Sequence, residues 1–120
     1  KTMPLVKIHY VENPKKEILN SLSVSLSQVV AETLSKSEDF VMIVFQKTEL
    51  QSFGNDSITS SIYVELKNVG ILHPETTCIL SSKITELFVN VLNVESSRIY
   101  IEFQASERHH WGWNGKTFSK

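Results

Sequence analysis

The segment SIYVELKNV at residues 61–69 decides the fold of this 120-residue chain. Its apolar and polar side chains alternate, which predicts a β-strand with one buried face. His73-Pro74-Glu75 then indicates the start of a helix, because a proline in the first turn loses no helical hydrogen bond. An apolar residue recurs every three to four positions up to Leu92, and residues 98–104 alternate again. Residues 61–104 therefore predict the order strand, helix, strand.

The first part of the chain repeats this order without repeating the sequence. Residues 5–10 alternate as a strand, with Pro4 on the side of the apolar residues. Asn13-Pro14 predicts a helix with asparagine as its N-cap, and an apolar stripe of about five turns follows. Residues 40–46 are apolar almost throughout, which predicts a strand buried on both faces. Residues 4–46 thus form another strand–helix–strand unit.

Two such units predict an α+β two-layer sandwich, in which one four-stranded mixed sheet carries two helices on one face. This arrangement lets the sheet face and the helix stripes bury each other. The opposite face includes semi-apolar residues such as Tyr10 and Tyr63, so we expect oligomerisation to cover it.

Composition excludes several classes of protein. Twelve basic and 13 acidic residues give a formal net charge of −1, which favours no general attraction to nucleic acid. Cys78 is the single cysteine, so no intrachain disulfide can form, and we expect it to be a small buried residue. No apolar run approaches the roughly 20 residues of a membrane span, and a signal-peptide pattern is absent. The cytoplasm is therefore the default compartment, although export without a signal peptide leaves no mark on a sequence.

A series of motifs, in order along nearly the whole chain, resembles the macrophage migration inhibitory factor (MIF) family of the tautomerase superfamily. The most specific are the strand from Arg98 to Phe103 and the ending from Trp111 to Phe118. The others are Met3-Pro4-Leu5, Lys36, Phe40-Val41-Met42-Ile43, Ser52-Phe53-Gly54 and Asn68-Val69-Gly70. The resemblance implies a homotrimer of βαβ repeats, with sheets lining the centre and an active site at each subunit interface.

The resemblance also implies an activity, which is keto–enol tautomerisation of phenylpyruvate-type substrates and isomerisation of a dopachrome substrate, without a cofactor. The family's base is an N-terminal proline, which Pro4 matches. Burial near a cation lowers the pKa of such an amine from about 8 toward neutrality, where a general base is effective. Lys36 and the backbone N–H of Val69 match the groups that stabilise charge on the substrate's carbonyl oxygen.

Six further residues match positions around the family's pocket. Tyr100 and Glu102 match positions that reach the pocket from the neighbouring subunit. The wall of the pocket is matched by Trp111, Trp113 and Phe118, and Phe40 stands where relatives have a tyrosine at the rim. Many relatives have an uncharged asparagine in place of Glu102, and a carboxylate near the amine would favour its protonated form. The positive charge of Lys67 offsets the negative charge of Glu102 if these two side chains meet. If they do not meet, both are solvated charges.

The residues alone leave other interpretations open. Pro4 is also typical of the start of an edge strand, and Lys36 is typical of a solvated lysine at the C-terminal end of a helix. Tyr100 is also compatible with an ordinary core or interface position. His109-His110 does not predict a metal site, because adjacent residues of an extended segment point to opposite sides and no further ligand has suitable spacing. The alternative function is a non-catalytic, MIF-like cytokine or receptor-binding module with a vestigial pocket.

Lys1-Thr2-Met3 precede Pro4 in this chain, so the proline nitrogen is an amide and not a base. Either the natural protein begins further upstream and has lost the chemistry, or residues 1–3 are a leftover extension plus the initiator methionine. Because relatives begin with Met-Pro, we expect the second. A single MIF-like domain would then occupy residues 4–120, inactive until Pro4 is freed. Possible partners are further copies of the chain, a small aromatic keto or enol acid, and a protein receptor.

Overall fold

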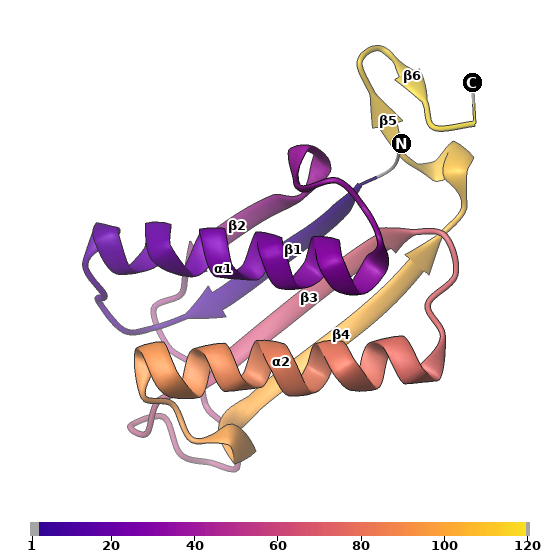
Figure 1. The fold of residues 1–120 in the computed structure, drawn as a ribbon. Helices are drawn as coiled ribbons and strands as arrows, with labels where there is room; N and C mark the ends of the chain where they lie inside the picture. The colour runs from indigo at the N-terminus through magenta and orange to yellow at the C-terminus, as the bar shows by residue number, and fades with distance from the viewer. Residues whose placement is uncertain (1–2, 120) are drawn as a thin grey trace.

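The computed structural model describes residues 3–119, which form two layers (Figure 1). Within these residues the elements follow the predicted order of two strand–helix–strand units and end in a small hairpin. In chain order they are β1 (Pro4–Tyr10), α1 (Lys16–Leu34), η1 (Glu38–Phe40), β2 (Met42–Lys47), β3 (Ile62–Val69), α2 (Pro74–Leu92), η2 (Ser96–Arg98), β4 (Ile99–Ser106), η3 (Arg108–His110), β5 (Gly112–Trp113) and β6 (Lys116–Thr117).

The main sheet has the strand order β2-β1-β3-β4. Strands β1 and β2 run parallel within the first unit, β3 and β4 run parallel within the second, and β1 joins β3 antiparallel. Both α1 and α2 lie across the same face (Figure 1). The predicted fold class, a mixed four-stranded sheet with helices on one face, is confirmed for the described part of the chain.

The core lies between the helices and the sheet. Alternate residues of β1 and β3 face the helices, while their neighbours face outward. The side chains that fill the core are at most 2% exposed and include Val6, Ile8, Leu22, Leu26, Val30, Val64, Leu66, Leu80, Ile84 and Phe88. Burial of this apolar set fixes the sheet against both helices, so the ends of its strands are rigid positions for side chains.

Two predictions near the first unit are wrong. Helix α1 begins at Lys16 rather than after Asn13, whose side-chain oxygen accepts a hydrogen bond from Lys47 and so does not cap the helix. Phe40 lies in η1, and β2 is an edge strand of half-buried and exposed residues rather than one buried on both faces. The reason is topological, because β2 pairs with β1 alone and the helices cover one face only.

Two single residues also differ from expectation. Tyr10 is 8% exposed and faces the helices, because it shares its parity with the buried residues of β1; its ring packs edge-on against Phe45 at 6.3 Å. Tyr63 does lie on the face away from the helices, as predicted. Cys78 is exposed, because it lies about 200° around α2 from the buried Leu80.

No helix of residues 3–119 is long and apolar enough to cross a membrane.

Candidate active site

The candidate site lies at the end of the sheet where β1 begins. Pro4 is the first residue of β1, is buried, and pairs with Asn68 of β3. The start of β1, η1 and the C-terminal hairpin meet at this end of the molecule (Figure 1). Segments from the two ends of the chain thus lie at the same end of the sheet as Pro4.

The end of α1 brings Lys36 to Pro4. Ser35 adopts a left-handed conformation (φ 55°, ψ 48°), and the Lys36 N–H donates to Ala31 O at 2.8 Å, so the helix ends in a tight C-terminal turn. This turn directs the chain back toward the sheet. The Lys36 side chain then extends over the end of β3 and is half-buried there.

The Lys36 ammonium donates to three oxygens of the described chain. Its Nζ lies 2.8 Å from Oδ1 of Asn68, 2.9 Å from the Val69 carbonyl oxygen and 3.3 Å from the Met3 carbonyl oxygen. An ammonium has three N–H donors, so each of them has an acceptor. Val69 therefore meets Lys36 through its carbonyl; the role predicted for its N–H stays a prediction.

Burial lowers the pKa of Lys36 below its usual value of 10.5, and the positive charge of Arg108 lowers it further. Both effects have a simple cause, since removal from water and a like charge each disfavour the protonated amine. Arg108 lies in η3, directly after β4. Two cations thus act on one end of the sheet, which favours a ligand with negative charge.

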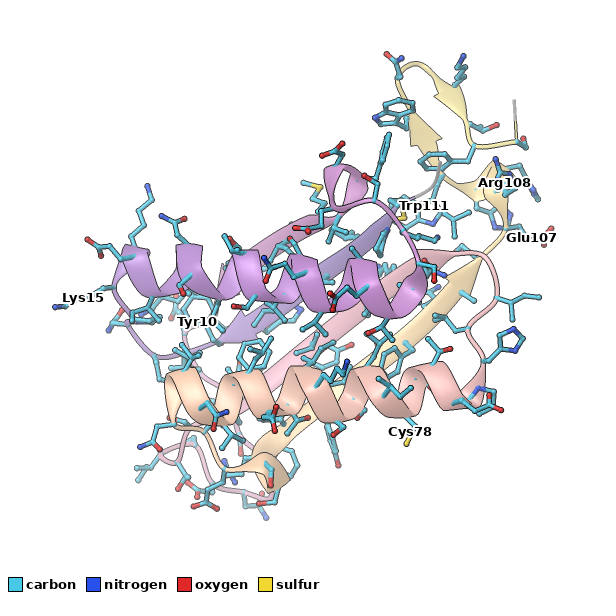
Figure 2. All side chains as sticks on the ribbon, in the orientation of Figure 1. Tyr10, Lys15, Cys78, Glu107, Arg108 and Trp111 are labelled. Atoms are coloured by element: carbon cyan, nitrogen blue, oxygen red, sulfur yellow. The ribbon has the colours of Figure 1, made fainter. Side chains whose placement is uncertain are left out.

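An apolar cavity of about 280 Å³ lies beside the start of β1, where Met3 and Leu5, the two neighbours of Pro4, line it; Pro4, Lys36 and Val69 are not among its lining residues. Its lining joins the start of β1 to η1, β2 and the hairpin, and includes Met3, Leu5, Phe40, Met42, Trp111, Trp113 and Phe118. The rings of Phe40 and Trp113 meet edge to face at 5.2 Å, and those of Trp113 and Phe118 stack at 6.3 Å. In Figure 2, Trp111 points toward η1, whereas Glu107 and Arg108 lie on the outer side of the same C-terminal segment. Such walls suit a flat aromatic ligand.

The structure therefore brings Lys36 to Val69 and to the residue before Pro4, and it gathers the four predicted aromatic residues around a neighbouring cavity that Met3 and Leu5 connect to this group. It does not bring Tyr100 and Glu102 to them within one chain. Tyr100 pairs with Tyr63 of β3, five residues and about 16 Å along the strand from Asn68. Its ring packs on Phe53 at 4.8 Å and is 66% exposed.

Glu102 accepts a hydrogen bond from the Tyr63 hydroxyl on the open face of the sheet, which is the face away from the helices. This bond is the main reason that the pKa of Tyr63 is raised to about 12. Lys67 lies 3.7 Å from Glu65, whose other oxygen is 2.7 Å from His9. Lys67 thus forms an ion pair with Glu65, while Glu102 is hydrogen-bonded to Tyr63.

Asn68 is a site residue that the sequence analysis missed. It is 2% exposed, and its amide oxygen is the shortest contact of the Lys36 ammonium. A signal was available, because Asn68 shares its parity with Val64 and Leu66 and so falls on the buried face of its strand. A polar residue at a buried strand position needs a hydrogen-bond partner, and such a position deserves a search for one.

The fold and this cavity define the class of the protein, a βαβ-repeat domain with the tautomerase-superfamily fold. The family profile described as Macrophage migration inhibitory factor (MIF) matches residues 3–119, and the chain belongs to this family.

Individual relatives agree with the profile. A macrophage migration inhibitory factor homolog of Brugia malayi is 30% identical over 105 residues, which are 88% of this chain and 90% of the relative. The crystal structure of a macrophage migration inhibitory factor homologue from Prochlorococcus marinus has a TM-score of 0.87 at 32% identity, over 95% of this chain and 98% of that one. A fused 4-OT chain, described as a symmetric trimer, shares the fold with a TM-score of 0.86 at 13% identity over 96% of each chain.

Proposed function

We propose that the form of this protein that begins at Pro4 is a cofactor-independent keto–enol tautomerase of the phenylpyruvate tautomerase and L-dopachrome isomerase type. The observation that carries the proposal is the 3.3 Å contact between Lys36 Nζ and the Met3 carbonyl oxygen. The carbon of this carbonyl is bonded to the Pro4 nitrogen, so the ammonium lies beside the atom proposed as the base.

The proposed mechanism uses this proximity twice. The positive charge of Lys36 and the burial of Pro4 both lower the pKa of a proline amine, which leaves it unprotonated near neutral pH. The amine removes a proton from the carbon next to the substrate's carbonyl, and the released electron pair forms the C=C bond. The carbonyl oxygen then gains negative charge, which Lys36 and the Val69 N–H stabilise. It takes up a proton from water to give the enol, while the protonated Pro4 amine returns its proton to water and is ready for the next cycle.

The apolar cavity would hold the substrate's ring. Trp111, Trp113, Phe118 and Phe40 offer flat aromatic surfaces there, and the cations Lys36 and Arg108 would attract the carboxylate of an aromatic keto acid. The chemistry of these walls thus supports phenylpyruvate-type substrates over apolar or cationic ones.

We propose further that the site is completed in a homotrimer by Tyr100 and Glu102 of a neighbouring copy. Tyr100 is a large aromatic residue that is mostly exposed in a single chain, at the far end of the sheet from Pro4. Exposed rings of this kind are frequent in protein interfaces. The fold shared with a chain described as a trimer supports the same assembly.

The test compares a chain that begins at Pro4 with one that retains residues 1–3. Interconversion of the keto and enol forms of phenylpyruvate is followed by ultraviolet absorbance. We expect the retained extension to lower kcat/KM by about a hundredfold or more, the usual value of a general base. Equal rates in the two forms would exclude Pro4 from the mechanism.

One observation favours the alternative, a binding module with a vestigial pocket, for a form that retains Met3. In that form each N–H of Lys36 already has an oxygen acceptor from the chain, so none remains for a substrate. The same experiment separates the two functions, since a binding module would show no turnover in either form.

A further inference from the structure

We propose that Asn68 is a positioning residue for this reaction, which orients the Lys36 ammonium so that one N–H points to the substrate oxygen beside Pro4. The inference rests on the proposed function and extends it to a residue that does not itself touch the substrate.

Asn68 occupies an unusual place for a polar side chain. It lies on β3 opposite Pro4, on the face that carries the core residues Val64 and Leu66, and it is 2% exposed. A buried amide is costly unless its groups are hydrogen-bonded. Here the Oδ1 atom accepts from Lys36 at 2.8 Å, and Nδ2 lies 3.4 Å from the Gly70 carbonyl oxygen.

This geometry fixes the orientation of the amide. Lys36 can only donate hydrogen bonds, so the oxygen of Asn68 must face it and the NH₂ group must face away. The Gly70 carbonyl lies on that other side and accepts from the NH₂ group. Since Asn68 cannot turn without losing both partners, its oxygen is a fixed point for the ammonium.

Two fixed acceptors determine where the third donor points. Asn68 and the Val69 carbonyl hold two N–H groups of Lys36, and the remaining one is directed to the Met3 carbonyl oxygen next to Pro4. In a chain that begins at Pro4, residue 3 is absent and this N–H faces the substrate. Asn68 therefore sets the direction of the single donor left for the substrate oxygen.

The neutral charge of Asn68 is as important as its shape. An amide accepts a hydrogen bond without cancelling the positive charge that lowers the pKa of Pro4 and stabilises the developing negative charge. The charged groups near this end of the sheet include Arg108 of η3, which acts on Lys36, and Asp39 of η1, which lines the neighbouring cavity. They also include Glu107, which lines a hollow with Gly70 and Arg108, and Lys67, which pairs with Leu5 and lies on the opposite face of β3 from Asn68. A carboxylate in place of Asn68 would add a negative charge in direct contact with Lys36.

Asn68→Asp, made in the form that begins at Pro4, tests the proposal with almost no change in shape. The new carboxylate should favour the protonated form of the Pro4 amine and move the acidic limb of the kcat/KM profile to higher pH by about one unit or more. The matched control is Asn20→Asp, which adds the same charge on the exposed surface of α1, near its other end. We expect no shift for this control, and equal profiles for the two variants would overturn the proposal.

Asn68→Ser keeps the position neutral and covers the case in which the aspartate variant does not fold. Its shorter hydroxyl should not hold the ammonium in place, so kcat should fall about tenfold while the acidic limb moves by less than about 0.3 units. A purely structural role of Asn68 would instead change the thermal stability and leave kcat of the folded protein at the wild-type value. That result would overturn the proposal.

A measurement without substrate separates this inference from the proposed function. In the same variants, NMR titration of the Pro4 nitrogen and of the Lys36 side chain gives both pKa values directly. If the chain that begins at Pro4 has no tautomerase activity, the proposed function fails, and the titration still tests Asn68. Unchanged pKa values in Asn68→Asp relative to Asn20→Asp would refute the role of Asn68.

Discussion

The two ends of the sheet each hold a cation that donates to main-chain oxygens, and they use it differently. At the far end Arg98 donates to the carbonyls of Phe53, Asp56, Thr59 and Ser60 at 2.9–3.1 Å, and its guanidinium lies 5.2 Å from the centre of the Phe53 ring. At the near end Lys36 donates to Met3, Asn68 and Val69. Arg98 therefore holds a loop in place, whereas Lys36 holds one oxygen of Met3, the residue directly before Pro4.

This difference shows how a structural cation can be told from a candidate site cation. The acceptors of Arg98 are all internal to residues 53–60, and its side chain is 12% exposed. One acceptor of Lys36 lies on residue 3, directly before the proposed base, and an apolar cavity lies beside it. The comparison predicts that a change at Lys36 affects activity and a change at Arg98 affects stability.

Lys36→Gln should have the largest effect. In the form that begins at Pro4 we expect kcat/KM for phenylpyruvate to fall by about 10²–10³-fold, the usual cost of losing one donor to a developing oxyanion. The thermal midpoint should stay within a few degrees of the wild-type value, because the side chain is only half-buried. A large loss of stability with activity retained would make Lys36 a structural cation and remove the contrast between the two ends.

Arg98→Met should act in the opposite way. It leaves the four carbonyl oxygens without their donor, and we expect the free energy of unfolding to fall by about 3 kcal/mol, measured by urea denaturation. Arg98→Lys is the matched control, since it keeps the charge but cannot serve as many acceptors with one ammonium. It should recover only part of the loss, and a wild-type unfolding curve for Arg98→Met would show that the loop does not depend on this residue.

The sequence predicted the elements of this fold well, because period-two and helical patterns report directly on burial. The alternation of residues 61–69 and the His73-Pro74 helix start agree with β3 and α2. Helix and strand ends were less predictable. Asn13 has the chemistry of an N-cap, and a long-range contact with Lys47 uses its side chain instead.

The candidate site was predictable only in part, because it too depends on contacts between residues that are far apart in the sequence. Aromatic residues of the pocket and Lys36 follow from motifs that resemble the family. Asn68 lies in one of those motifs, and its role depends on a contact with a residue 32 positions earlier, which no local pattern encodes. In a single chain Tyr100 lies toward the other end of the sheet and Glu102 lies opposite Glu65 near its middle, so their predicted role at the site depends on assembly.

Asp56→Asn tests the far end with the smallest expected effect. The Thr59 hydroxyl, followed by the backbone N–H groups of Thr59 and Ile58, lowers the pKa of Asp56 from its usual 3.8 to about 2. Because the pKa is lower in the folded than in the unfolded state, the carboxylate stabilises the fold above about pH 4, and this contribution is lost as the pH falls toward 2. Thermal unfolding should therefore show a small decrease in Tm for the variant at pH 7, and this decrease should shrink steadily as the pH is lowered from 4 to 2. A difference of the same size at both pH values would mean that the loop depends on the shape of Asp56 and not on its charge.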